Sequence, residues 1–307
     1  MTDLHKKRSK LSIWIQAVRA FSFPASLIPS LLGIMFATLY LPHQSTWWLI
    51  PFIMISLLCL HAGSNVVSDY DDFNRGVDYK GSLGGSGVLV EELLTPKQAY
   101  LGAMVLFAVA ILFGIPIIIE KGFIILAFGL IGMLSGYFYT AKPVGFKYIA
   151  LGDFIFFFLY GPAITLGTYY ALTGSYHSTV LLASIPLGLL VSGILHANNM
   201  RDIIHDRKAN IKTIATIMGE GFAKGEYVFL ITGAYLVVII LVAFTILSPW
   251  ALLVLLSLPP AIKNMTAIKG VKIEDTAKIA MLDVQTAQLT LLFGVLLSLS
   301  VLLTKLI

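Results

Sequence analysis

The chain has 307 residues, of which 58% are hydrophobic and only 12% are charged, and its mean hydropathy is +0.88. Soluble proteins carry about 25% charged residues. A water-soluble fold of this length could not bury so much apolar surface, so the composition excludes one and indicates an integral membrane protein. The net charge of +5 does not indicate nucleic-acid binding, because the basic residues lie in short clusters between apolar segments. The single cysteine, Cys59, excludes an internal disulfide and a cysteine-based zinc site.

The N-terminal segment is polar and basic, and the apolar run that follows it is long enough to span a bilayer. We therefore expect no cleavable signal peptide. Residues 1–12 are predicted to form a polar cytoplasmic tail. Apolar runs of about 20 residues, typical of transmembrane helices, then alternate with short polar connections. Nine spans are predicted, at residues 20–41, 47–69, 98–119, 122–141, 150–172, 179–200, 226–247, 249–269 and 285–306.

The predicted fold class is an all-α polytopic membrane protein. Residues 1–307 are expected to form a single membrane domain, in which a bundle of nine transmembrane helices surrounds an apolar pocket. The mouth of this pocket is expected to be polar and to lie on the cytoplasmic side.

Charged residues are divided unevenly between the two sides of this bundle. With nine spans, 19 of the 21 Lys and Arg residues fall on the side of the N-terminus, and only Lys121 and Lys305 fall on the other. The positive-inside rule then predicts a multi-pass protein of the cell membrane with a cytoplasmic N-terminus and the C-terminus on the opposite side. Fifteen of the 16 acidic residues share the cytoplasmic side. The rule does not require this, so the acidic residues indicate where the active site lies.

Two acidic motifs stand at the cytoplasmic ends of the second and sixth predicted spans. On a helix, residues four or seven to eight apart share one face. The first motif therefore places Asn65, Asp69 and Asp72 in one stripe. The second motif does the same for Asn198, Asp202 and Asp206. The Asn-x-x-x-Asp element thus recurs 133 residues later in a span of the same direction, which suggests an internal repeat.

Carboxylates stacked on a helix face repel one another and are costly to bury near a membrane, so two such stripes require a cation. The candidate ligands are all oxygen atoms, which favours Mg²⁺. Magnesium in proteins is held by one or two carboxylates together with substrate phosphates. We therefore predict a diphosphate site bridged by Mg²⁺, with Asp69, Asp72, Asp202 and Asp206 as metal ligands. Asn65 and Asn198, one turn deeper, are predicted to orient a diphosphate oxygen or a metal-bound water.

The motifs resemble those of the UbiA superfamily of intramembrane prenyltransferases, and within it the 1,4-dihydroxy-2-naphthoate polyprenyltransferases of menaquinone synthesis. The first motif of that branch is matched here by Asn65, Asp69, Tyr70, Asp72, Gly76 and Asp78. The second is matched by Asn198, Asn199, Arg201, Asp202, Asp206, Lys212 and Thr213. Similar segments occur at Arg19, at Gly84–Leu89 and at Tyr139–Pro143. The resemblance covers nearly the whole chain.

The resemblance implies transfer of a polyprenyl group from polyprenyl diphosphate to an aromatic acceptor, with 1,4-dihydroxy-2-naphthoate expected to give demethylmenaquinone, CO₂ and diphosphate. It adds Asp78 and Tyr139 to the predicted substrate-binding residues. Basic side chains on the cytoplasmic side are further candidates to bind the diphosphate: Arg19, Lys142, Lys147, Arg201, Lys208 and Lys212. Arg201 could instead pair with a neighbouring carboxylate. Asp153, at the start of the fifth span, has no assigned role, and the buried histidines His61 and His196 are predicted to be structural.

Other functions remain open at this stage. A sister prenyltransferase would use hydroxybenzoate, homogentisate, haem or a glycerol phosphate as acceptor. A secondary transporter also carries intramembrane acids and repeats, although transporters usually place their charges near the midplane of the bilayer and often use inverted repeats. A non-catalytic polyprenyl-binding scaffold would not need two acidic motifs.

Overall fold

The computed structural model describes residues 8–41, 43–81, 84–272, 275 and 278–306. Within these residues the fold is helical, and the only strand-like pairing is an isolated bridge between Ile149 and Lys212. The elements are α1 Lys10–Ala17, η1 Ala20–Ser22, α2 Pro24–Tyr40, η2 Trp47–Leu49, α3 Ile50–Asn74, α4 Pro96–Lys121, α5 Phe123–Tyr137, η3 Phe146–Tyr148, α6 Gly152–Phe158, η4 Leu159–Ala163, α7 Ile164–Thr173, α8 Ser178–Arg201, α9 Ile203–Lys208, α10 Ile214–Met218, α11 Glu220–Ala243, η5 Pro249–Ser257, α12 Leu258–Lys269 and α13 Leu282–Leu306.

Eight helical segments of the described chain are long and apolar enough to cross a membrane, in place of the nine predicted. The segment that falls short is the predicted fourth span, 122–141. It forms α5, whose 15 residues measure about 22 Å against a hydrocarbon core of about 30 Å. Gly122, with φ of 74°, begins this helix directly after α4, and the chain turns away after Tyr137.

Local sequence explains where several other helices begin and end. Thr95 and Gln98 form a capping box at the start of α4, with Pro96 in its first turn. The fifth predicted span is continuous from α6 to α7 but contains a π-helical turn, η4, around Pro162. The seventh was predicted to begin at 226, whereas α11 begins at Glu220, because Gly219 takes a positive φ of 83° and allows the chain to turn directly into the helix.

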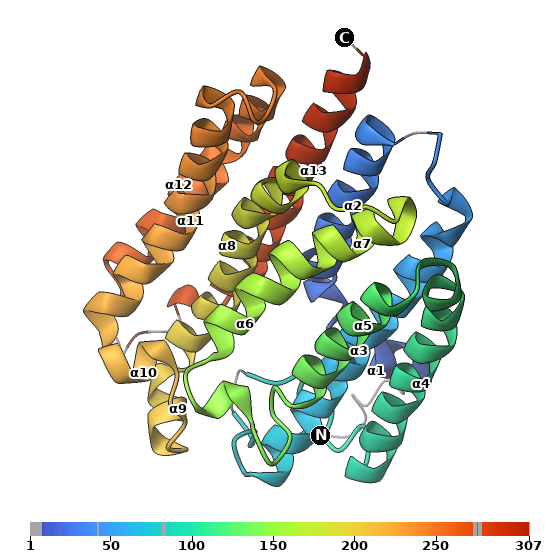
Figure 1. Ribbon diagram of the computed structural model, residues 1–307. Coiled ribbons are helices and arrows are strands. Elements are labelled where there is room, and N and C mark those ends of the chain that lie inside the picture. Colours follow the sequence, from blue (N-terminus) through green and yellow to red (C-terminus); the bar gives the residue numbers. More distant parts are fainter. Residues whose placement is uncertain (1–7, 42, 82–83, 273–274, 276–277, 307) are drawn as a thin grey trace.

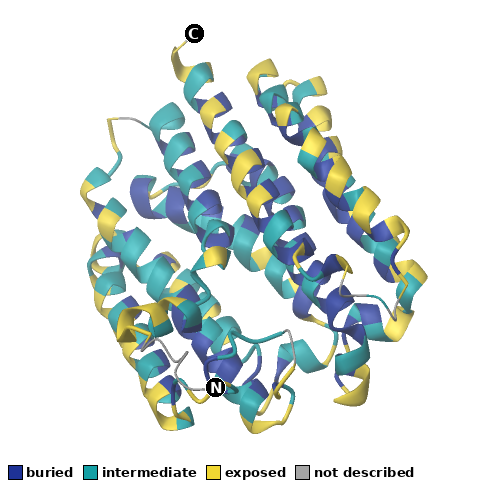
Figure 2. Cartoon of the chain, turned by 180° about the vertical axis from the view of Figure 1, so that it is seen from behind, coloured by how far each residue is buried: buried dark blue, intermediate teal, exposed yellow. Residues whose placement is uncertain are grey.

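Helix α8 forms the centre of the bundle. Of its most apolar 18-residue stretch 72% is buried, compared with 22% for α4 at the periphery. Figure 2 shows buried residues along the inward faces of the helices and exposed residues along the outer ones. Many of the exposed residues are large and apolar, such as Ile119, Phe123 and Phe229. An outer surface of this kind is suited to contact with lipid chains.

The elements that carry polar motifs gather at one end of the bundle. In Figure 1, the end of α3, the segment η3 and the short helices α9 and α10 lie at the lower end, whereas α13 ends at the upper end. Helix α5 runs back alongside α4 and returns the chain to the lower end. The short α5 therefore keeps the alternation of helix directions that nine spans would give.

Candidate functional site

The first acidic motif lies on the last turns of α3. This helix continues to Asn74, five residues beyond the predicted end of the span, so Asn65, Asp69 and Asp72 share one continuous helix as predicted. Both aspartates are buried. Asp69 forms an ion pair with Arg19 and accepts a hydrogen bond of 3.0 Å from the Ser86 backbone N–H.

Asp72 is held by two residues that follow α5. Lys147 Nζ lies 2.7 Å from one carboxylate oxygen of Asp72, and the Tyr148 hydroxyl donates a 2.8 Å hydrogen bond to the other. The Tyr148 ring also lies under the Arg75 guanidinium, 4.3 Å from its carbon. Lys147 was one of the basic candidates to bind the diphosphate, and Tyr148 was not predicted at all. Nothing in the local sequence around Tyr148 indicates a partner 76 residues away.

The second motif does not lie on one continuous helix, contrary to the prediction. Helix α8 ends at Arg201, and Asp202 is its C-terminal cap with φ of −93° and ψ of 6°. Helix α9 begins at Ile203 and carries Asp206. The Asp206 N–H still donates a 2.8 Å hydrogen bond to the Asp202 carbonyl, so the two aspartates remain neighbours across the break.

Arg201 is buried and pairs with carboxylates of the protein. Its guanidinium nitrogens lie 2.8 Å from Asp202 and 2.8 Å from Asp283 of α13, and it also donates to the side-chain oxygen of Asn198. Of the two roles considered for Arg201, pairing with a neighbour is the one that the structure shows. Asp283 was missed, because it lies in a different span from either motif.

The two motifs converge on one site. The bridge between Ile149 and Lys212 joins the segment that carries Lys147 to the segment that follows α9. A Cβ atom on Gly84 would lie 3.2 Å from Oδ2 of Asp202 and 3.8 Å from Oδ1 of Asp78, so this glycine lies between a residue of each motif. Burial alone would lower the pKa of Lys147, but the nearby charges of Asp72, Asp206 and Asp78 raise it.

Two carboxylates of this site are strongly perturbed. Burial raises the pKa of Asp206 to about 7, with Lys147 opposing the shift and Asp202 and Asp72 adding to it. Burial, together with repulsion from Asp72, raises the pKa of Asp78 to about 6. Both shifts arise first from burial and are increased by neighbouring carboxylates, as is common for acids at functional sites.

The residues of this site suit Mg²⁺. Among the described residues, five aspartates are buried here, and three basic side chains form ion pairs with them: Arg19, Lys147 and Arg201. Within the part of the chain that the structure describes, no donor is hydrogen-bonded to the carboxylates of Asp78 or Asp206. The donor set consists of oxygen atoms with excess negative charge, which Mg²⁺ prefers. The five are Asp69, Asp72, Asp78, Asp202 and Asp206.

Other predicted residues surround these carboxylates in different ways. The Asn65 amide donates to the Val18 carbonyl at 2.9 Å and so fixes the turn between α1 and η1. The Tyr139 ring packs against Phe156 with centroids 5.1 Å apart, and the pKa of Tyr139 is raised by burial and by nearby carboxylates. Lys142 and Lys212 are exposed. These positions do not test the predicted roles in substrate binding, which remain predictions.

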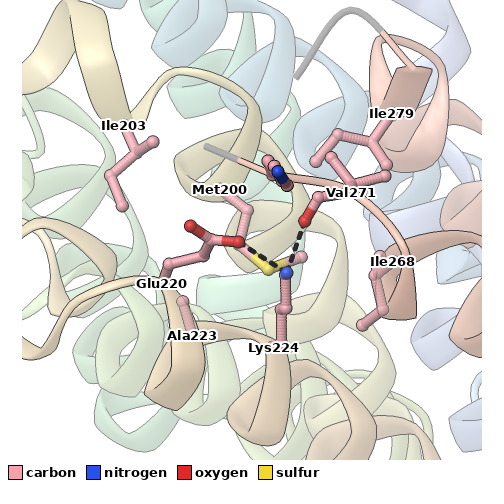
Figure 3. Close-up of a pocket in the computed structure, with 9 residues that line it drawn as sticks. Met200, Ile203, Glu220, Ala223, Lys224, Ile268, Val271 and Ile279 are labelled. Carbon is pink, nitrogen blue, oxygen red and sulfur yellow. Dashed lines mark hydrogen bonds and ion pairs between the residues drawn. The ribbon is translucent and has the colours of Figure 1, made fainter. Parts of the chain in front are cut away.

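An apolar cavity of about 360 Å³ lies deeper in the bundle than the first motif, along residues 53–64 of α3. It is bordered by α2, α3, α4, α5, η4 and α7, and the polar side chains of His61 and Ser64, one turn or less from Asn65, line it. His61 is hydrogen-bonded to Ser22 at 3.1 Å, in agreement with the structural role predicted for it. A second hollow, of about 20 Å³, contains none of the predicted site residues, and the Lys224 side chain there pairs with Glu220 at 2.6 Å (Figure 3).

The helical bundle and its buried carboxylates define a multi-pass membrane protein with a polar site at one end. Residues 26–282 match the UbiA prenyltransferase family. The chain therefore belongs to this family and is a membrane prenyltransferase, which decides against the transporter and scaffold alternatives.

Relatives with known names support the assignment. The chain is 32% identical over 303 residues to the 1,4-dihydroxy-2-naphthoate octaprenyltransferase of Bacillus subtilis (strain 168), covering 97% of this chain and 95% of that protein. It is 34% identical over 264 residues to human UbiA prenyltransferase domain-containing protein 1, covering 83% of this chain and 74% of that protein.

Solved structures share the fold. A UbiA homologue from Archaeoglobus fulgidus, bound to GPP and Mg²⁺, superposes with a TM-score of 0.62 at 15% identity, over 94% of this chain and all of that chain. The apo structure of a UbiA homologue from Aeropyrum pernix K1 gives 0.64 at 13% identity, over 92% and 96% of the two chains. At these identities the similarity concerns the fold.

Proposed function

We propose that the protein transfers a polyprenyl group from polyprenyl diphosphate to 1,4-dihydroxy-2-naphthoate, forming demethylmenaquinol, the hydroquinone form of demethylmenaquinone, with release of CO₂ and diphosphate. The observation that carries this proposal is the convergence of two buried acidic motifs, from α3 and from the α8–α9 junction, at one end of an apolar bundle. Such a site suits a substrate with a diphosphate head and a long hydrocarbon tail.

Mg²⁺ would be held by four carboxylates, those of Asp69, Asp72, Asp202 and Asp206. The metal would supply positive charge that binds the diphosphate and stabilises it as a leaving group. Cleavage of the allylic C–O bond leaves a diphosphate anion and a delocalised carbocation. Arg19 and Lys147 contribute fixed positive charges beside these carboxylates. Because both are already in place and shielded from bulk water, they stabilise the developing anion without reorganising.

The apolar cavity provides the place for the prenyl tail. It begins about one helical turn before Asn65 along α3 and is lined by aliphatic side chains and several glycines of α4 and α5. Burying the tail there removes it from water and holds its reactive end near the acidic motifs.

The acceptor is proposed from the relatives. The Bacillus subtilis protein is a 1,4-dihydroxy-2-naphthoate octaprenyltransferase and aligns with 97% of this chain. The acceptor ring forms a C–C bond with the prenyl carbon, and the carboxylate on the ring is lost as CO₂. Sister acceptors such as hydroxybenzoate or homogentisate are the alternatives that the assay must exclude.

The test uses membranes that contain the protein, Mg²⁺, a labelled polyprenyl diphosphate and a panel of aromatic acceptors. We expect prenylation of 1,4-dihydroxy-2-naphthoate, its loss with EDTA, and a fall of about 10²–10³-fold or more in Asp69→Ala and Asp202→Ala. The exposed carboxylate Glu91 offers a matched control, and Glu91→Ala should retain activity. Prenylation of a different acceptor would overturn the acceptor assignment, and unchanged turnover in both aspartate variants would overturn the site.

A further inference from the structure

Three ionisable side chains from three helices meet in the bundle, apart from the two acidic motifs. Asp153 lies in the first turn of α6, His196 in α8 and Glu226 in α11, and both α6 and α11 pack against α8 (Figure 1). One carboxylate oxygen of Asp153 and one of Glu226 each lie 3.6 Å from Nδ1 of His196. All three atoms lie within 4.8 Å of one another.

The neighbours of His196 determine how its ring is used. Its Nε2 lies 2.8 Å from the Ala223 carbonyl oxygen, which can only accept, so Nε2 carries the hydrogen. In the neutral ring Nδ1 then presents a lone pair toward the two carboxylates. Ala223 and Glu226 lie three residues apart on α11, so one helix supplies both the group that orients the ring and one of the facing oxygens. Histidine ligands of metals are commonly oriented by a backbone carbonyl in this way.

Among the described residues, the three facing atoms form no hydrogen bond. They are Oδ1 of Asp153, Nδ1 of His196 and Oε2 of Glu226, and all three are buried. The 3.6 Å separations exceed those of a hydrogen bond. Nor does any Lys or Arg of the described chain pair with either carboxylate. A neutral histidine would leave two buried negative charges, and a protonated one would leave one, both of which are costly inside a membrane protein.

We propose that Asp153, His196 and Glu226 bind a divalent transition-metal ion, with Zn²⁺ as the favoured occupant, at a site separate from that of the diphosphate. A divalent ion neutralises both carboxylates and uses the lone pair of Nδ1. Ligands 2.0–2.1 Å from a tetrahedral zinc ion lie about 3.3 Å apart, so the two separations of 3.6 Å from Nδ1 of His196 require only a small adjustment of the side chains. The imidazole ligand distinguishes this site from the all-oxygen set of the acidic motifs.

The ion would fasten α6, α8 and α11 together close to the acidic motifs. His196 lies two residues before Asn198 in α8, so fixing its ring also fixes the part of α8 from which the second motif emerges. The Tyr139 hydroxyl lies beside the start of α6, since a Cβ on Gly152, the neighbour of Asp153, would stand 3.3 Å from it. The metal would thus have a structural role, setting the position of the second motif relative to α6.

The test measures the zinc content and the thermal stability of the purified full-length protein. The protein is stripped with a chelator, re-exposed to Zn²⁺ and dialysed. Excess Mg²⁺ in the dialysis buffer saturates the diphosphate site. We expect about one zinc ion per chain, and an unfolding midpoint that rises with Zn²⁺. Glu226→Gln and Asp153→Asn should lose both effects. Each substitution preserves side-chain shape and removes a repulsive charge, so the variants should fold.

Two matched variants separate this site from others. Glu220→Gln changes a carboxylate on the same helix that pairs with Lys224, and Asp202→Asn changes the second motif. Both should retain zinc. The proposal is overturned if the wild type retains no zinc, if Glu226→Gln retains as much as the wild type, or if Asp202→Asn loses it. None of these readouts depends on prenyl transfer, so the proposed function can fail without affecting this test.

Discussion

At the scale of the residue, the buried pair between Lys147 and Asp72 is the contact that matters most for the first motif. The Lys147 side chain is 19% exposed and that of Asp72 only 2%. Replacing Lys147 with methionine keeps most of the side-chain volume but leaves a buried carboxylate without its ion pair. We expect the free energy of unfolding in EDTA to fall by about 3–5 kcal/mol, measured by thermal or denaturant unfolding. The exposed lysine in Lys208→Met serves as the control, and an equal effect of both variants would contradict this interpretation.

Gly85 belongs to the segment Gly84–Leu89, where Gly84 and Gly85 lie next to the carboxylates of the site. The space where its Cβ would stand is occupied by the Asp78 carboxylate, so Gly85→Ala must displace either this segment or Asp78. We expect the rate of prenyl transfer to fall by about tenfold or more. An increase of about 1.4 kcal/mol in the activation free energy is enough for a factor of ten. Steady-state kinetics on membranes measure the effect. Gly270→Ala, where a Cβ meets no atom within 4 Å, should leave activity unchanged.

At the scale of the element, the sequence was sufficient to locate helices but not their junctions. The apolar runs predicted spans that the structure confirms within a few residues for α2, for α4, and for η5 and α12 taken together. The errors occur where local backbone geometry, and not hydropathy, determines a helix end. They are the six-residue extension at the start of α11 and the break at Asp202 that separates α8 from α9. Hydropathy does not register such a break, because Asp202 and Ile203 continue the pattern of a helix end.

Helix α5 provides a prediction about prenyl length. Gly129 and Gly132 both line the apolar cavity, and a Cβ on Gly129 would meet no atom within 4 Å, so a larger side chain at Gly129 would extend into free space. Gly129→Leu should therefore fold normally and fill part of the cavity. We expect activity with long polyprenyl diphosphates to fall by about tenfold or more relative to short ones, in line with 1–3 kcal/mol for overpacking. Competition between labelled donors of two lengths measures the ratio of the activities with long and short donors. An unchanged ratio would show that the cavity does not bind the prenyl tail.

At the scale of the whole molecule, the residues that the sequence did not reveal are those that come together only in the folded bundle. The acidic motifs were visible because their members lie within one or two helical turns. Tyr148 and Asp283 were not, since each meets its partner across 76 or more residues. Asp153 was noted without a role and His196 was predicted to be structural, because no spacing rule connects them with each other or with Glu226.

The direction of the chain through the membrane depends on α5, the predicted span that, in the described part of the chain, is too short for the length criterion. Lys147 follows α5 and contacts Asp72 at the end of α3, so α5 must return the chain to the end of the bundle where α3 finishes. If α3 ends in the cytoplasm, as the excess of basic residues predicts, then Glu120 lies outside and Lys142 inside. Both residues are exposed and flank α5.

Cysteine labelling tests this arrangement directly. Cys59 is the only cysteine of the chain, so a Cys59→Ala background permits single probes at Glu120→Cys and Lys142→Cys. With a membrane-impermeant maleimide on intact cells, we expect Glu120→Cys to react and Lys142→Cys to react only after the membrane is opened. Lys208→Cys should behave like Lys142→Cys, because the two acidic motifs share one end. Reaction of both flanking probes from the same side would mean that α5 does not cross, and the two motifs could not then meet at one face of the membrane.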